Sequence, residues 1–198
     1  NVSVTYPGGV EALKDLNLEI KDGDFIIIVG LSGAGKSTLL RTVNNLVKPS
    51  TGSVYLEGKN VTSAKKKELK KIRSQIGMIF QTFNLVNRST VLKNVLTGRL
   101  SNISTIRSIL GLWPKDQKEM AFEALNQVEI LEKAYVRASN LSGGQQQRVG
   151  IARALSQKPK VMLADEPVAS LDPITSRVVM SYLKTVSYTH LRAHETLR

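Results

Sequence analysis

Apolar and polar residues follow two different periods along the chain, and each period predicts a kind of secondary structure. Over residues 1–80 apolar side chains alternate with polar ones or form short runs, which is typical of half-buried and buried strands. The stretches predicted as strands are 1–6, 16–20, 25–29, 52–57 and 76–80. From about Val86 to Asn140 the alternation is absent, and apolar residues recur at helical spacing. This segment is predicted to be a helical insertion.

A glycine-rich loop lies between the apolar run at 25–29 and a helix-like stretch at 38–43, and it has the form GxxxxGK[ST]. Its glycines permit close turns in which backbone N–H groups surround a polyphosphate, and the next helix adds unpaired donors and a positive dipole end. Lys36 can reach the β- and γ-phosphates, and the Ser37 hydroxyl can ligate Mg²⁺. A surface turn matching by chance is disfavoured by the flanking strand and helix. The residues expected to hold the nucleotide are Gly30, Leu31, Ser32, Gly33, Ala34, Gly35, Lys36, Ser37 and Thr38.

A second pair of glycines occurs in Leu141-Ser142-Gly143-Gly144-Gln145, directly before apolar residues at helical spacing. This pattern predicts another helix N-terminus that can bind an anion. Ser142 is also a good N-cap by itself, so a simple helix cap is the alternative. A cap does not need two glycines, whose flexibility has an entropic cost unless something approaches the backbone closely.

Two carboxylates follow the apolar run 161–164, which is predicted to be a central parallel strand. Asp165 and Glu166 then emerge at its C-terminal end, where open α/β sheets place their ligands. Asp165 is expected to hold Mg²⁺ through water, and Glu166 to polarise an attacking water. A strand that ends in Asp-Glu is common in isolation, so this interpretation depends on the phosphate loop upstream.

Composition limits the class of protein. The chain has 198 residues with 41% hydrophobic content, enough for one core with an inserted subdomain, and its lack of cysteine fits a reducing cytoplasm. No apolar run approaches the roughly 20 residues that span a bilayer, which predicts a soluble or peripheral protein. The net charge of +12 suggests a nucleotide, a nucleic acid or an anionic membrane face as partner. The densest basic run, 65–73, is interpreted as a solvated helix face anchored by Leu69 and Ile72.

Taken in order, the glycine loop, the LSGGQ pentapeptide and the apolar run ending in Asp-Glu resemble the nucleotide-binding domain of ATP-binding-cassette (ABC) ATPases. The resemblance covers most of the chain, and LSGGQ is specific to that superfamily. It implies an α/β fold: a P-loop NTPase (RecA-like) core, an N-terminal antiparallel β subdomain and an inserted α-helical subdomain at about 86–140. The ATPase domain is expected to span 1–185.

The same resemblance assigns further positions. Tyr6 matches the aromatic that stacks on adenine, with a strand residue on the core face as the alternative, and Gln81 matches the glutamine that touches Mg²⁺ and the attacking water. Ser170-Leu171-Asp172 matches a loop that crosses to the opposite subunit. It also implies a homodimer in which the signature of one subunit closes on ATP held by the other. The signature residues expected there are Ser142, Gly143, Gly144 and Gln145.

Within the superfamily, residues 83–86, 92–99, 110–113 and 165–173 are similar to the phosphonate-import ATPases. This implies ATP-driven uptake of a phosphonate or related phosphorus oxyanion at the cytoplasmic face of the membrane, with permease subunits and, indirectly, a solute-binding protein as partners. No nucleic acid is expected. The alternatives are an importer of another small solute, a nucleic-acid-linked ABC ATPase, and a non-catalytic module that dimerises on ATP.

Both ends depart from the family pattern. The chain begins within the first strand, and after a helix at 177–184 it lacks the turn and apolar strand that precede a γ-phosphate-contacting histidine. Residues 186–198 resemble a translated sequencing adapter and are interpreted as non-native, and His190 comes too early to replace that histidine. We therefore expect truncation at both ends and a chain that binds ATP better than it hydrolyses it.

Overall fold

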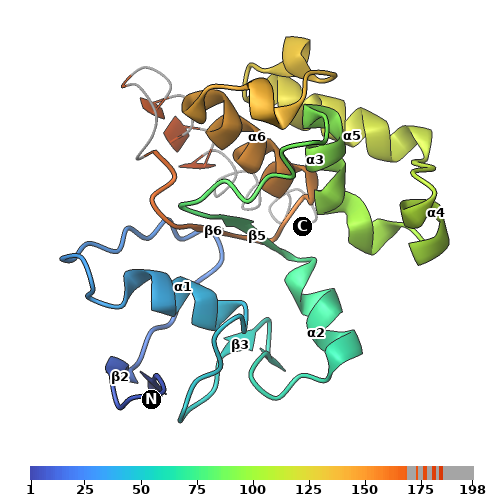
Figure 1. The fold of residues 1–198 in the computed structure, drawn as a ribbon. Coiled ribbons are helices and arrows are strands. Elements are labelled where there is room, and N and C mark those ends of the chain that lie inside the picture. The colour runs from blue at the N-terminus through green and yellow to red at the C-terminus, as the bar shows by residue number, and fades with distance from the viewer. Residues whose placement is uncertain (169–172, 174–175, 178–179, 182, 185–198) are drawn as a thin grey trace, which may run out of the picture. The chain divides into compact units, whose positions relative to one another are not determined.

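The computed structural model describes residues 1–168 together with 173, 176–177, 180–181 and 183–184 (Figure 1). The chain forms two compact units, the first built from Asn1–Arg73 with the segment from Lys184 and the second from Ser74–Leu183. The expectations for residues 170–172, for His190 and for the tail at 186–198 lie outside the described residues. Each unit holds part of the chemistry expected above.

The first unit opens with an antiparallel pair, β1 (Val2–Thr5) and β2 (Glu11–Leu16). A tight turn through Gly8 and Gly9, both at positive φ, brings Val4 opposite Leu13. This hairpin confirms the strand predicted at the start of the chain. The strand predicted at 16–20 is wrong, because the short turn pairs the residues just after it with β1 and leaves 17–20 outside the ladder.

The first unit continues with α1 (Lys36–Val43), the hairpin of β3 (Tyr55–Leu56) and β4 (Lys59–Asn60), and α2 (Lys66–Arg73). Only the last part of the predicted strand 52–57 pairs, because Glu57 and Gly58 both take positive φ and turn the chain within two residues. In α2 the lysines are exposed while Ile72 is buried, which confirms the solvated-face interpretation for the lysines. Arg73 is the exception, because it is half-buried and donates hydrogen bonds to the carbonyls of Asn44 and Asn45.

The apolar run 25–29 is not a strand in the structure, and this prediction is wrong. Its five side chains are between 40% and 88% exposed. A strand is a property of a pair of segments, and among the described residues of the first unit no segment forms a ladder with this run. The apolar composition predicted a buried strand, but the run has neither a hydrogen-bonding partner nor a buried face among the described residues.

The second unit contains a parallel pair, β5 (Ile76–Ile79) and β6 (Val161–Ala164), with Ile76 opposite Val161 and Ile79 opposite Ala164. All four residues of β5 are buried. The pair confirms both strands that were predicted from short apolar runs. Parallel pairing also brings the C-terminal ends of the two strands to the same edge.

Helices make up most of the rest of the second unit, as the helical spacing predicted. They are α3 (Val91–Leu96), η1 (Thr97–Asn102), α4 (Thr105–Ile109), α5 (Lys115–Gln127), η2 (Leu131–Lys133), η3 (Ala138–Asn140) and α6 (Gly143–Ser156). Figure 1 shows α6 running beside α3 and α5. Fully buried side chains from all three helices, among them Val95, Leu125 and Val149, form the core of this unit. No helix in the described part of the chain is long and apolar enough to cross a membrane.

A buried arginine ties these helices together. Arg99 donates hydrogen bonds to Gln117 Oε1 at 2.8 Å and to the carbonyl of Ser156 at 2.8 Å. Burial lowers the pKa of Arg99, and the nearby charge of Asp116 opposes that shift. The guanidinium therefore fastens η1 to the start of α5 and to the end of α6.

Candidate nucleotide-binding site

The glycine loop keeps its expected shape in the first unit. Gly33 and Gly35 adopt φ of 81° and 86°, a region that side-chain-bearing residues rarely enter, and Ala34 N–H donates to the Leu31 carbonyl at 3.2 Å. A Cβ at Gly35 would lie 2.4 Å from the carbonyl oxygen of Ala12, so the loop passes directly against β2. Residues 30–34 are exposed, which leaves the backbone N–H groups accessible to a ligand.

The Lys36 side chain folds back over this loop. Its Nζ donates to the carbonyls of Gly30 at 2.7 Å and Leu31 at 2.8 Å. The ammonium group is thereby held at the loop by two backbone dipoles instead of extending into solvent. A phosphate bound by the loop N–H groups would meet a positive charge already in place.

Tyr6 lies beside the beginning of α1. Its hydroxyl and Thr38 Oγ1 are 3.2 Å apart, within hydrogen-bond distance, although the two residues are 32 positions apart in the chain. The tyrosine is 37% exposed, so part of the side chain remains open to solvent. The first unit thus brings together Tyr6 and the whole glycine loop, from Gly30 to Thr38.

The second unit brings together the catalytic candidates. Gln81 follows β5, Glu166 follows β6, and Gln81 Nε2 donates to Glu166 Oε2 at 2.9 Å. Asp165 is only 4% exposed, and its backbone N–H donates to the Ile79 carbonyl at 2.9 Å, continuing the ladder beyond β6. Glu166 takes φ of 50°, which turns its side chain out of the strand's alternation toward Gln81. The parallel pairing thus sets the amide and the carboxylates at one edge.

The signature forms the first turn of α6. Ser142 Oγ accepts a hydrogen bond from Gln145 N–H at 3.4 Å, and Gln145 Oε1 accepts one from Ser142 N–H at 3.0 Å. This reciprocal capping box is the simple-cap alternative, and it accounts for both of these side chains. It does not account for Gly143, where an added Cβ would meet only the edge of Phe83 at 3.9 Å. Packing within the described chain therefore gives no reason for a glycine at this position.

Two polar residues of α6, to which we assigned no role from the sequence, connect the signature helix to the catalytic edge. Gln147 is 2% exposed, and its Nε2 donates to the Pro167 carbonyl at 2.9 Å, just after Glu166. Arg153 donates to the carbonyls of Asn84 at 2.6 Å and Phe83 at 3.0 Å, just after Gln81. Burial lowers the pKa of Arg153. Helix α6 is thus fastened to both segments that carry the catalytic candidates.

Among the described residues no group of three or more His, Cys, Asp or Glu side chains could hold a metal ion by itself. The donors expected for Mg²⁺ are the Ser37 hydroxyl, the Gln81 amide oxygen and the Asp165 carboxylate. These are hard oxygen ligands of the kind that Mg²⁺ takes in small number beside substrate phosphates and waters. By chemical type each of these donors suits the ion; Ser37 belongs to the first unit, and Gln81 and Asp165 belong to the second.

A glycine loop with a poised lysine, a strand ending in two carboxylates and an LSGGQ helix together define an ATP-binding cassette. Residues 13–169 match the ABC transporter family, and the chain belongs to that family. Among solved structures it is similar to the dimeric MJ0796 cassette bound to ADP and Pi, with a TM-score of 0.85 and 39% identity over 94% of this chain and 81% of that one. The P-loop NTPase fold and the ATPase class are therefore established.

The relatives narrow the class further. The chain is 59% identical to a phosphonates import ATP-binding protein PhnC from Bacillus thuringiensis subsp. konkukian, over 94% of this chain and 73% of the relative. It is 54% identical to a PhnC 3 protein from Halalkalibacterium halodurans, over 94% of this chain and 72% of that one.

Proposed function

We propose that this chain is the ATP-hydrolysing subunit of an ABC importer that takes up phosphonate or a related phosphorus oxyanion. The observation that carries the catalytic part is the 2.9 Å hydrogen bond between Gln81 and Glu166 at the end of the parallel strand pair. The similarity to phosphonate-import proteins supports the substrate class. An importer of another small solute is the second candidate, because the cassette does not itself bind the cargo.

ATP is proposed to lie along the glycine loop. The exposed backbone N–H groups of residues 30–33 and the N-terminus of α1 face its phosphates, and Lys36 exchanges its two carbonyl contacts for phosphate oxygens. Tyr6, held beside Thr38, is placed to cover the adenine ring. Ser37, Gln81 and Asp165 are the proposed ligands of Mg²⁺, which neutralises phosphate charge when bound.

Glu166 is the proposed general base. The Gln81 amide donates to one carboxylate oxygen, Oε2, which leaves the other oxygen to accept a proton from water. Because the amide group is planar, this contact also fixes the direction of Gln81 Oε1, which can then accept the second hydrogen of the same water. The pair would orient the water while the carboxylate takes its proton.

The signature is proposed to act on ATP held by a second copy of the chain. In the capping box Ser142 Oγ only accepts, so the hydroxyl hydrogen remains available to donate to a phosphate oxygen. Gly143 leaves its backbone open to close approach, and Gly144 and Gln145 complete the same turn. The dimeric state of the MJ0796 cassette supports the proposal of a dimer. Loss of the γ-phosphate would remove the bridge and release the pair.

The remaining partners follow from the importer class. We propose permease subunits as the membrane partner, a solute-binding protein as an indirect one, and a peripheral position at the cytoplasmic face of the membrane. The names of the relatives as import proteins support this. We further propose an ATPase domain over 1–185 with its helical subdomain at about 86–140, and a non-native tail at 186–198.

Replacing Glu166 by glutamine tests the catalytic assignment. The E166Q variant keeps the size of the side chain and can still pair with Gln81, but it has no carboxylate to accept a proton. We expect ATP hydrolysis to fall by about 100-fold or more while Mg-ATP binding stays within about twofold, because general-base catalysis contributes on that scale. Single-turnover rates of E166Q and of the unsubstituted chain are compared under identical conditions. Unchanged hydrolysis would refute the role of Glu166.

The substrate class needs a different measurement. Reconstitution with the permease and the solute-binding protein should give ATP hydrolysis that rises when the binding protein is loaded with phosphonate. Stimulation by another solute alone would favour the second candidate. Salt-dependent binding to DNA or RNA, steep on a log scale, would instead favour a nucleic-acid-linked ATPase.

A further inference from the structure

An exposed apolar surface lies on α4 and the turn that connects it to α5. We call the tip patch the surface formed by Ile106, Ile109, Leu110, Leu112 and Trp113, with the neighbouring cations Arg107 and Lys118. The four aliphatic side chains are between 58% and 79% exposed, although isoleucine and leucine are usually buried. Ile106, Ile109 and Leu110 are three and four positions apart and so share one face of α4, and Gly111, at φ of 67°, turns the chain between Leu110 and Leu112.

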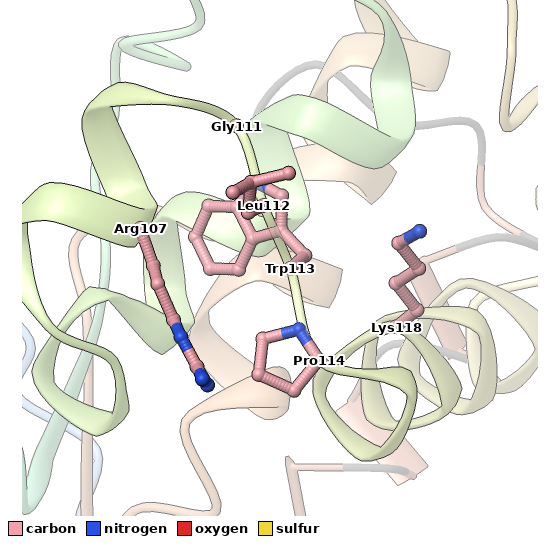
Figure 2. Close-up of a pocket in the computed structure, with 6 residues that line it drawn as sticks. All are labelled: Arg107, Gly111, Leu112, Trp113, Pro114 and Lys118. Atoms are coloured by element: carbon pink, nitrogen blue, oxygen red, sulfur yellow. The ribbon is translucent and has the colours of Figure 1, made fainter.

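Two cations line a hollow in this patch. Figure 2 shows Arg107 and Lys118 on opposite sides of Pro114 and Trp113. These residues line an open cavity of about 350 Å³. Within the described part of the chain neither side chain makes a hydrogen bond or an ion pair. By contrast, Lys115 lies 3.7 Å from Glu119, so that nearby charge is already partly compensated.

The sequence that precedes the tip patch in the second unit carries only positive charge. Residues 74–115 contain five Lys and Arg residues and no Asp or Glu. The first acidic residue after this stretch, Asp116, accepts a hydrogen bond from Gln117, and the next, Glu119, faces Lys115. The patch therefore combines exposed aliphatic groups, a half-buried tryptophan and uncompensated positive charge.

We propose that the tip patch binds directly to an anionic lipid surface. Its aliphatic side chains would enter the boundary between headgroups and acyl chains, Trp113 would lie at headgroup level, and Arg107 and Lys118 would contact lipid phosphates. A bilayer interface has apolar acyl chains directly below anionic headgroups, so it can contact the aliphatic side chains and the two cations at the same time. An apolar socket on a permease would instead desolvate both cations without a counter-charge.

The strongly basic helix α2 does not show this combination. Helix α2 carries more lysines, but its apolar residue Ile72 is buried, so that face offers charge alone. Aliphatic side chains contribute little to binding a nucleic-acid backbone, which argues against that partner at the tip patch. The proposal concerns contact with lipid and does not depend on the transported solute.

Trp113 is the only tryptophan of the chain, so its fluorescence reports on this surface directly. The full chain is mixed with vesicles of phosphatidylcholine containing about 30% phosphatidylglycerol, and separately with phosphatidylcholine alone. We expect a blue shift of Trp113 emission and quenching by bromine-labelled acyl chains with the anionic vesicles. Unchanged emission and no quenching would overturn the proposal.

Variants separate insertion from general attraction by charge. Each buried methylene changes partition by about fourfold, so I106S/I109S should weaken vesicle binding by about tenfold or more. Y55S removes a comparably exposed apolar side chain from β3 and should stay within about twofold of the original chain. Circular dichroism of each variant checks that helix content is retained. Equal losses for I106S/I109S and Y55S would contradict insertion at the tip patch.

A second matched pair addresses the cations. R107Q/K118Q and K66Q/K67Q each remove two exposed positive charges, the first pair from the tip patch and the second from α2. Binding should fall further for the tip pair, because its charges lie at the inserted surface. Equal losses would show binding by diffuse charge and overturn the proposal. A Trp113 shift seen only when the vesicles contain the permease would overturn it as well, in favour of a protein socket.

Discussion

Replacing Gly35 by alanine should damage the glycine loop through a contact inside the first unit, before any nucleotide is present. Gly35 has φ of 86°, and an added Cβ would lie 2.4 Å from the Ala12 carbonyl oxygen and 3.1 Å from Leu13 Cδ2. The first distance is far shorter than a carbon–oxygen contact, and its oxygen belongs to backbone that is paired in β2. Either the loop or the strand must therefore move.

The cost of the backbone conformation can be separated from the cost of the close contact. Placing alanine at positive φ costs about 1–2 kcal/mol, and overpacking a well-filled site typically costs about 1–3 kcal/mol more. Gly58 is a matched control in the same unit, because it has φ of 73° with no atom near its added Cβ. G58A should therefore lose only about 1–2 kcal/mol, while G35A should lose about 2–5 kcal/mol.

Hydrogen exchange at α1 provides the local measurement. The Leu39 N–H donates to the Gly35 carbonyl at 2.9 Å, so its protection reports whether the start of the helix stays in place. We expect faster Leu39 exchange in G35A than in G58A, together with weaker ATP binding in G35A alone. Equal exchange rates and equal unfolding free energies in the two variants would refute the reasoning from close approach.

Three further predictions follow from the two units. Lys36→Ala should weaken ATP binding in a fluorescent-nucleotide titration. Ser142→Arg should preserve ATP binding by the monomer but block ATP-driven dimerisation on a sizing column. Equal loss of monomer binding in the two variants would contradict the head-to-tail proposal. Arg153→Met should lower the free energy of unfolding by about 2–4 kcal/mol, since two charge-assisted hydrogen bonds are lost, and it should slow single-turnover hydrolysis. Arg153→Lys should recover part of the stability and part of the hydrolysis rate. Arg99→Leu should cost about 2–5 kcal/mol in urea unfolding, because two buried acceptors lose their donor, and a loss below about 1 kcal/mol would show that they are solvated.

Sequence reasoning succeeded where the chemistry is local. The glycine loop and the start of α6 each depend on neighbouring residues, and the structure places both as predicted. The ambiguity at Ser142 was also real, because the side chain does serve as a helix cap. Local patterns could predict both interpretations but could not choose between them.

The failures are non-local. Residues 16–20 and 25–29 have strand-like composition, but a strand needs a partner, and the turn after β1 selects a different segment. The contacts of Gln147 with Pro167 and of Arg153 with Asn84 join residues 20 and 69 positions apart. A polar residue inside an amphipathic helix gives no sign of which distant carbonyl it meets. Such a residue is distinguished from the other polar residues of the helix only by its burial, which cannot be read from the sequence.

The folded-back conformation of Lys36 has a consequence for how tightly a triphosphate is held. A solvent-extended lysine carries about 2 kcal/mol of rotamer entropy, part of which is lost whenever it is immobilised on a ligand. Here the Gly30 and Leu31 carbonyls have already restricted those rotamers in the resting chain. When the triphosphate binds, the Lys36 ammonium exchanges carbonyl oxygens for phosphate oxygens while the side chain stays in place. Lys36 therefore loses little further entropy, and its contribution to the binding affinity should change little with temperature.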